Sequence, residues 1–265
     1  MDAARVIDHI VAWLTEKCIA AGQNGFVIGI SGGIDSAVTS TLCARTGLPT
    51  LCVEMPIHQH FTQVERAQEH ISWLKDRHPN VRHEVVELTG VFDHLVRELP
   101  KPEDQRSTEL PLANTRARLR MTTLYFFSGL HRSLVAGTGN KVEDFGVGFF
   151  TKYGDGGVDL SPIADLYKSE VYALARELGI VKSVIDAAPT DGLWGDDRSD
   201  ADQIGASYPE LEWAMELRSQ RTDPSTIQMT SRQREVLAIF DRLHAANRHK
   251  MVPIPICEIP AYLRS

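Results

Sequence analysis

The first part of the chain alternates between two hydrophobic patterns. Near the N-terminus, apolar residues recur at steps of three and four, which predicts an amphipathic helix that ends near Gly22. This spacing is set by Val6, Ile7, Ile10, Leu14 and Cys18. Short apolar runs with β-branched residues follow, and such runs predict buried strands. We expect strands at 26–30, 50–55, 83–88 and 133–139.

Helical patterns separate these runs. They lie at 37–45, 63–75, 91–99 and 112–132, and two more follow at 169–178 and about 232–247. Strands that alternate with helices predict βαβ units with right-handed crossovers. The expected fold class is α/β: a doubly wound, Rossmann-like parallel sheet with helices on both faces. Ligand sites in such folds lie at the carboxyl ends of the strands.

Length and composition describe an ordinary globular protein. The 265 residues fit one domain, 1–265, and 43% of them are hydrophobic and 24% charged. The net charge of -7 argues against nucleic acid as a partner, because nucleic-acid-binding proteins usually present a basic surface. An anionic substrate would therefore be bound by cations placed locally.

The cysteines and the N-terminus favour a cytoplasmic protein. Cys18, Cys43, Cys52 and Cys257 form no C-x-x-C pair or zinc spacing and have apolar neighbours, which predicts buried thiols in a reducing compartment. The N-terminus lacks the basic and continuous apolar regions of a signal peptide. No apolar run approaches the roughly 18 to 20 residues that cross a bilayer, so we expect no membrane partner.

The segment SGGIDS at 31–36 follows a predicted strand and opens a predicted helix. In that position, two glycines let backbone N–H groups approach an anion, and the helix dipole and two serine hydroxyls add to the attraction. A plain capped turn is the alternative, and Gly-Gly alone would favour it. The segment matches neither a Walker loop nor a G-x-G-x-x-G loop. A carboxylate at Asp35 would repel phosphate unless a cation lay between them, which indicates Mg²⁺.

This segment resembles the SGGxDS signature of the ATP pyrophosphatases. The resemblance implies that the loop binds pyrophosphate and that ATP is cleaved between its α and β phosphates. The implied ATP-binding residues are Gly29, Ile30, Ser31, Gly32, Gly33, Ile34, Asp35, Ser36, Thr138, Lys168 and Thr190.

Four further segments narrow the resemblance to the ammonia-dependent NAD synthetases. They are NTRARLR at 114–120, GTGNKVED at 137–144, GFFTKYGDGGVD at 148–159 and LYK at 166–168. The similarity covers nearly the whole chain. It implies a homodimeric ligase that adenylates the carboxylate of deamido-NAD with ATP and Mg²⁺, releases pyrophosphate and lets ammonia displace AMP. No glutaminase domain fits in the 265 residues that the synthetase pattern occupies, so free ammonia is the expected nitrogen donor, with a separate glutaminase subunit as the alternative.

The resemblance also assigns roles to single residues. Glu143 would be a second Mg²⁺ ligand beside Asp35, although an isolated glutamate would more simply begin a helix. Lys168 begins a predicted helix, where a cation is disfavoured unless an anion such as a phosphate lies nearby. No side chain is expected to act as an acid or base. Lys168 would instead stabilise charge on the leaving pyrophosphate.

The residues implied to bind deamido-NAD are Arg118, Lys152, Asp159, His249 and Lys250. Without the resemblance, Lys152 and Asp159 would suggest an exposed turn. His249 and Lys250 would be cations at the C-terminus of a helix. Asn114 and Arg118 share one helix face, whereas Arg116 and Arg120 are expected to point to solvent.

Two segments depart from the family pattern. Adenine contacts at 55–66 therefore cannot be transferred, and neither can roles in the loop after Trp194. The acidic, glycine-containing stretch 188–205 suggests a lid over the site. Two rival functions are disfavoured. A tRNA-thiolating enzyme would need reactive cysteines and a basic surface, which the cysteine spacing and the net charge argue against. A nucleotide sensor would hold ATP without turnover, and the full set of cation and carboxylate positions argues against it.

Overall fold

A parallel four-stranded sheet lies at the centre of the fold. The computed structural model describes residues 1–190, 199–220 and 227–264. Its strands are β1 (Phe26–Gly29), β2 (Thr50–Glu54), β3 (Val81–Val85) and β4 (Leu134–Val135), in the order β3-β2-β1-β4. Every pair is parallel. With helices on both faces, described below, this arrangement confirms the predicted fold class.

The edge strands differ most from the sequence prediction. The third strand begins and ends earlier than predicted, because β3 lies at the sheet edge and is mostly exposed, so its residues do not form the expected apolar run. The fourth strand has only two residues. Its continuation is a single bridge between Ala136 and Leu160, because the chain turns into the Gly137–Gly139 segment directly afterwards.

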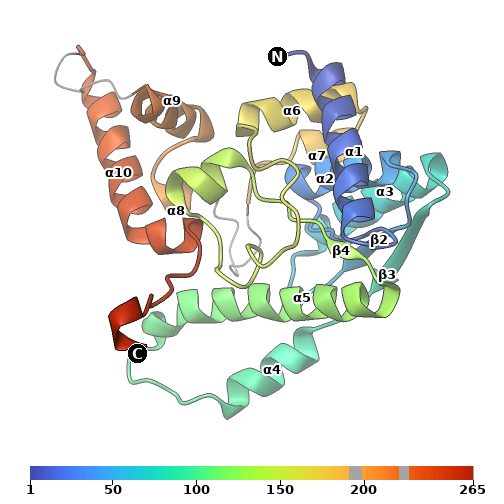
Figure 1. Ribbon diagram of the computed structural model, residues 1–265, viewed down its shortest axis with the longest axis horizontal. Coiled ribbons are helices and arrows are strands. Elements are labelled where there is room, and N and C mark those ends of the chain that lie inside the picture. The colour runs from blue at the N-terminus through green and yellow to red at the C-terminus, as the bar shows by residue number, and fades with distance from the viewer. Residues whose placement is uncertain (191–198, 221–226, 265) are drawn as a thin grey trace.

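One face of the sheet is covered mainly by three helices (Figure 1). They are α1 (Ala3–Ala20), α2 (Ile34–Arg45) and α6 (Lys168–Glu177), with α3 (Phe61–Arg77) and α7 (Lys182–Ile185) packed beside them. The predicted periodic residues Ile7, Ile10, Leu14 and Cys18 are buried in this core. The helix α2 is buried along almost its whole length, which fixes the loop before it rigidly to the sheet.

The opposite face is covered by α5 (Glu109–His131) and α4 (Thr89–Glu98). A short 3-10 helix, Gln105–Thr108, precedes α5. In Figure 1, α5 runs along the lower side of the molecule with α4 below it. Val27 and Val53 from the strands pack here with Phe92 of α4 and Leu124 of α5. Successive residues of β1 therefore pack on opposite faces of the sheet, as expected for a strand buried on both faces.

A third hydrophobic cluster stands apart from the sheet. It joins a π-helix, η2 (Val142–Val147), to α9 (Tyr208–Ser219) and α10 (Ser231–Met251), with the short α8 (Asp200–Ile204) at its edge. Figure 1 shows these helices on the side away from the strands. Val142, Leu211 and Phe240 are buried in it. The assignment of the whole chain to one domain stays a prediction.

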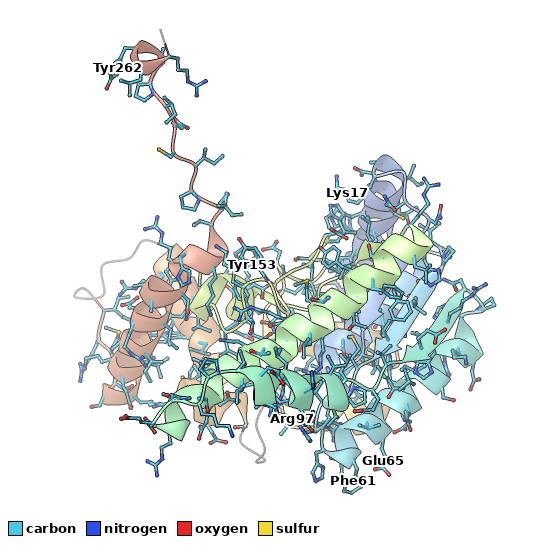
Figure 2. The ribbon with its side chains drawn as sticks, turned by 90° about the horizontal axis from the view of Figure 1, so that it is seen from below. Lys17, Phe61, Glu65, Arg97, Tyr153 and Tyr262 are labelled. Atoms are coloured by element: carbon cyan, nitrogen blue, oxygen red, sulfur yellow. The ribbon has the colours of Figure 1, made fainter. Side chains whose placement is uncertain are left out.

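The C-terminal segment leaves the body of the molecule after α10. Residues 252–264 are exposed, and only a short 3-10 helix, Ala261–Leu263, is regular. Figure 2 shows this segment projecting away from the remaining chain, with Tyr262 near its end. Cys257 lies on it and is exposed, so the prediction of a buried thiol is wrong for this residue. The other three cysteines are buried, and burial raises the pKa of Cys52 to about 12.

The strand order creates a crevice. From β1 the chain passes through α2 to β2 on one side, whereas β4 pairs with the other side of β1. Connections that diverge from adjacent strands in this way leave an opening at the carboxyl ends of the strands. The predicted phosphate loop and the Gly137–Gly139 segment both begin there. Within the described ranges, every helix is too short or too polar to cross a membrane.

Candidate functional site

The loop after β1 is held by its own serines. The hydroxyl of Ser36 donates to the carbonyl of Gly33 at 2.9 Å, and the N–H of Gly33 donates to the hydroxyl of Ser31 at 3.2 Å. Gly32 has φ +81°, and a Cβ added to it would lie 2.3 Å from the backbone oxygen of Gln63. Only glycine fits that position. The predicted phosphate loop is therefore a preformed turn pressed against α3.

Three charged side chains from distant parts of the chain meet beside this loop. The ammonium of Lys168 donates to Asp35 Oδ2 at 2.5 Å and to Glu143 Oε1 at 3.0 Å. Asp35 lies in the first turn of α2, Glu143 lies in η2, and Lys168 is the first residue of α6, as predicted. The anions beside Lys168 are these carboxylates, which the sequence analysis did not anticipate as its partners.

These charges are largely removed from water. The side chain of Lys168 is 5% exposed, and those of Asp35 and Glu143 are 17% and 16% exposed. Burial alone would lower the pKa of Lys168, but the two carboxylates outweigh burial and hold this pKa well above its ordinary value. The ammonium therefore stays charged at neutral pH.

The donor set fits a divalent cation together with a nucleotide. Asp35 and Glu143 offer the carboxylate oxygens that Mg²⁺ prefers, and they lie close enough to share one cation. In the described part of the chain, no group of three or more His, Cys, Asp or Glu side chains is placed to hold a metal alone. Mg²⁺ commonly binds through one or two carboxylates and completes its shell with substrate phosphates and water, so this pair suits an ion that arrives with ATP.

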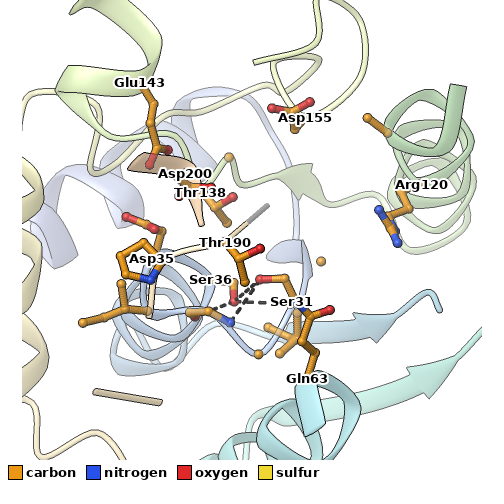
Figure 3. A pocket seen from close by; sticks show the side chains of 18 of the residues that line it. Ser31, Asp35, Ser36, Gln63, Arg120, Thr138, Glu143, Asp155, Thr190 and Asp200 are labelled. Carbon is orange, nitrogen blue, oxygen red and sulfur yellow. Dashed lines mark hydrogen bonds between the residues drawn. The ribbon is translucent and has the colours of Figure 1, made fainter. Parts of the chain in front are cut away.

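The loop at Ser31–Ser36 and the charged side chains of Asp35, Glu143 and Lys168 line the same cleft. Its lining includes every residue implied to bind ATP: Gly29, Ile30, Ser31, Gly32, Gly33, Ile34, Asp35, Ser36, Thr138, Lys168 and Thr190. Figure 3 shows Asp35, Glu143 and Asp200 on one side of this cleft and Arg120 on the opposite side. The loop residues, the Gly137–Gly139 turn and the start of α6 thus face one space.

Four of the residues implied to bind deamido-NAD gather next to this cleft but do not line it. Lys152 connects them: its backbone oxygen accepts from the guanidinium of Arg118 at 3.3 Å, and its ammonium donates to the carbonyl of His249 at 2.8 Å. The ammonium of Lys250 donates to the carbonyls of Gly148 and Phe150, each at 2.8 Å. These four side chains are brought together, and each has a partner in the chain itself.

Asp159 lies away from that group. One of its carboxylate oxygens accepts from the N–H of Val135 at 2.8 Å, and the other accepts from the hydroxyl of Tyr125 at 3.0 Å. Both contacts join β4 and α5 to the turn that carries Asp159. Asp159 therefore has a structural role beside the last strand, and its contact with deamido-NAD stays a prediction.

The expectation that Arg116 and Arg120 point to solvent is wrong. Arg120 lines the cleft, and its guanidinium donates to the backbone oxygen of Met55 at 3.0 Å. Arg116 stacks over the ring of Phe92 at 4.7 Å. The reason is that α5 lies between the sheet and α4, so more than one of its faces is covered. Arg118, in contrast, is exposed.

Several cleft residues were missed by sequence reasoning. Gln59, Gln63 and Arg66 line the cleft from the segment after β2, where the family pattern gave no guidance. Asp155, in the YGDGG turn, and Asp200 line it too. The position of Asp155 between glycines was a usable signal, because glycines allow close approach to a ligand. The suggested lid, 188–205, includes residues 191–198, which lie outside the described residues.

The comparisons with known proteins agree with one another. The family model described as NAD synthase matches residues 6–253. The NH(3)-dependent NAD(+) synthetase of Carboxydothermus hydrogenoformans is 39% identical over 77% of this chain and 82% of its own length. Among solved structures, NMN synthetase from Francisella tularensis is 29% identical, with a TM-score of 0.81 over 98% of this chain and 99% of its own. The NH3-dependent NAD synthetase from Campylobacter jejuni is 29% identical, with a TM-score of 0.73 over 97% and 100%.

Proposed function

Because this chain belongs to the NAD synthase family, we propose that its cleft carries out the amidation of deamido-NAD with ammonia, at the expense of ATP. The products are NAD, AMP and pyrophosphate. The protein is thus a ligase that forms a C–N bond, and ATP is its co-substrate. The observation that supports this reaction best is the convergence of Asp35, Glu143 and Lys168 beside a preformed glycine loop.

A carboxylate resists attack by ammonia and must first be activated. In the proposed first step, an oxygen of the nicotinate carboxylate attacks the α-phosphorus of ATP, and the bond to pyrophosphate breaks. In the second step, ammonia attacks the carbonyl carbon of this acyl adenylate, AMP leaves, and the proton lost from nitrogen passes to solvent. Neither step requires a side-chain base. Both require the two reactants to be held close together.

The chain supplies charge and position for these steps. The turn at Ser31–Ser36 and the N-terminus of α2 receive the β and γ phosphates. The Lys168 ammonium, held beside this turn by Asp35, would move toward the leaving pyrophosphate and stabilise the negative charge that grows there. Thr138 and Thr190 contact ATP from the other walls of the cleft.

Asp35 and Glu143 would hold a Mg²⁺ ion, which when bound neutralises phosphate charge. Support for the ion comes from charge balance. Asp35, Glu143 and Asp200 lie on one side of the cleft, opposite Arg120 (Figure 3), and such an acidic wall would repel a polyphosphate that carried no cation.

The acid to be amidated would enter from the side of Lys152. Arg118, Lys152 and Lys250 form a cationic group beside the cleft, next to His249, and guanidinium and ammonium groups suit the phosphates of deamido-NAD. Asp159 follows Lys152 along the chain, bonds to Val135, and would contact the dinucleotide from outside this group. Their bonds within the chain would have to exchange for bonds to the dinucleotide. In this proposal, the protein carries out the reaction in the cytoplasm.

A second candidate reaction is amidation of the corresponding mononucleotide. It is favoured by the similarity to NMN synthetase over 98% of this chain and by the fact that none of the five residues implied to bind the dinucleotide lines the cleft. A mononucleotide lacks the AMP half and would need fewer contacts outside the cleft. The activating chemistry would be the same.

One experiment tests both reactions. The protein is incubated with ATP, Mg²⁺ and ammonium, together with either deamido-NAD or nicotinate mononucleotide, and the amide, AMP and pyrophosphate are measured. We expect all three products in equal amounts, with deamido-NAD the better acid. Amide from the mononucleotide alone would select the second candidate. If folded protein forms no amide from either acid, both proposals are wrong.

We also propose that the protein acts as a homodimer. Phe126 and Leu130 are four residues apart on α5 and are 64% and 62% exposed, and the projecting segment 252–264 adds further exposed apolar side chains. Exposed apolar patches of this kind often mark interfaces. Sedimentation velocity should give twice the chain mass of 29.5 kDa. Phe126→Arg should give monomers, whereas Ile19→Arg, at an exposed site on α1, should not. A monomeric wild type would contradict the proposal.

A further inference from the structure

A buried phenol stands behind the carboxylate of Glu143. Tyr208, the first residue of α9, is 8% exposed, and its hydroxyl donates to Glu143 Oε1. The same hydroxyl lies 2.9 Å from Asp200 Oδ2. Tyr208 thus connects the helical cluster of α9 and α10 to the acidic wall of the cleft, across 65 residues of sequence.

The position of Tyr208 is itself well fixed. Ser207 and Glu210 form a reciprocal cap at the start of α9, in which the Glu210 carboxylate accepts from the N–H of Ser207 at 2.8 Å. Arg232 of α10 donates to that same carboxylate at 2.7 Å. The ring of Tyr208 lies 4.6 Å from the Lys168 ammonium, which adds a cation–π contact. The phenol can therefore act as a rigid support.

The hydrogen bonds of Glu143 define what that support does. Lys168 and Tyr208 both donate to Oε1, so Oε2 can contact a cation while the bond from Tyr208 persists. Glutamate has several rotatable bonds, and without a fixed contact its carboxylate would have to be ordered each time a cation bound. Carboxylates that hold metals are commonly fixed by an outer hydrogen bond in this way.

We propose that Tyr208 is a positioning residue that holds Glu143 ready for the divalent cation that accompanies ATP. This inference rests on the proposed function, because it takes Glu143 as a ligand of that cation. The ring of Tyr208 also packs in the hydrophobic cluster, so a purely structural role is the alternative. The two roles differ in what loss of the hydroxyl alone would change.

Tyr208→Phe removes the hydroxyl and keeps the ring. The test measures binding of the non-cleavable analogue α,β-methylene-ATP by calorimetry at a series of Mg²⁺ concentrations. We expect the Mg²⁺ concentration for half-maximal binding to rise about 10-fold, as for loss of one hydrogen bond to a charged group. Binding at saturating Mg²⁺ should change little, and in the amidation assay the Mg²⁺ requirement should rise while kcat at saturating Mg²⁺ is nearly kept.

Tyr167→Phe is the matched control. Tyr167 packs against the same cluster and precedes Lys168, but its ring contacts Lys141 at the surface. Its Mg²⁺ midpoint should equal that of the wild type. In a Glu143→Gln background, Tyr208→Phe should have little further effect, because the carboxylate it positions is gone.

An unchanged midpoint, or equal weakening at all Mg²⁺ concentrations, would overturn the proposal in favour of a structural role. If Tyr208→Phe does not fold, 4-fluorophenylalanine at position 208 keeps the shape and removes the hydrogen-bond donor; a wild-type midpoint would then overturn it. Analogue binding does not require amide formation, so the midpoint tests Tyr208 even if the proposed reaction fails.

Discussion

Lys168→Met should reduce amide formation at least about 10³-fold, with the loss mainly in kcat. Removal of one group that stabilises developing charge typically costs about 10² to 10³ in rate, and Lys168 also carries a full charge at that point. The effect should be large because the ammonium is almost fully buried against Asp35 and Glu143. Initial rates at saturating ATP, Mg²⁺ and ammonium measure it.

The same substitution leaves two largely buried carboxylates without their cation, so a loss of stability of about 3 to 5 kcal/mol should accompany it. Urea unfolding separates that loss from the kinetic effect, provided that rates are compared where both proteins are folded. Lys141→Met is the control. Lys141 pairs at 2.8 Å with Asp165, whose side chain is 97% exposed, and pairs this exposed contribute at most about 1 kcal/mol. If Lys168→Met keeps a tenth of the wild-type rate, the charge argument is wrong.

Gly32→Ala should disrupt ATP binding and stability together. Its φ of +81° disfavours any side chain by about 1 to 2 kcal/mol. The added Cβ would also lie 2.3 Å from the Gln63 backbone oxygen, and relief of such overpacking costs about 1 to 3 kcal/mol more. Because α3 cannot move without disturbing the core, the loop would shift instead. We expect a stability loss of about 2 to 5 kcal/mol and an ATP affinity lowered about 100-fold or more.

Gly22→Ala separates the two causes. Gly22 has a similar φ of +64°, but no atom lies within 4 Å of an added Cβ. This variant should lose only about 1 to 2 kcal/mol and should bind ATP normally. Urea unfolding and calorimetric titration of ATP with Mg²⁺ measure both variants. Equal losses of stability and ATP affinity at the two positions would show that the contact with Gln63 does not contribute to the effect.

The sequence predicted the central part of the fold better than its edges. The strands at 26–30 and 50–55 match β1 and β2 to within one residue, because both lie inside the sheet and need continuous apolar runs. The edge strand β3 has exposed positions, so its pattern is weaker and its start was misplaced. The helix α9 was not predicted, since its buried residues face a cluster formed only when η2 and α10 pack against it.

The candidate site divides in a similar way. The residues implied to bind ATP were predicted together, and they do line one cleft, because contiguous segments of characteristic sequence carry most of them. Asp200 and Arg66, which line the cleft, and Tyr208, which contacts Glu143, lie in no such segment, and only tertiary packing brings them there. Arg120 was misjudged because helix periodicity shows which residues share a face, but not how many faces are covered.

The ion pair at Lys168 has a consequence for how the protein is loaded. Its ammonium already lies between the two carboxylates, so the acidic side of the cleft carries its own counterion before any ligand arrives. Folding therefore does not require a bound metal, because Lys168 offsets the repulsion between Asp35 and Glu143 when no ligand is present. The incoming nucleotide and its cation have only to displace that internal counterion toward the phosphates, where the reaction needs it.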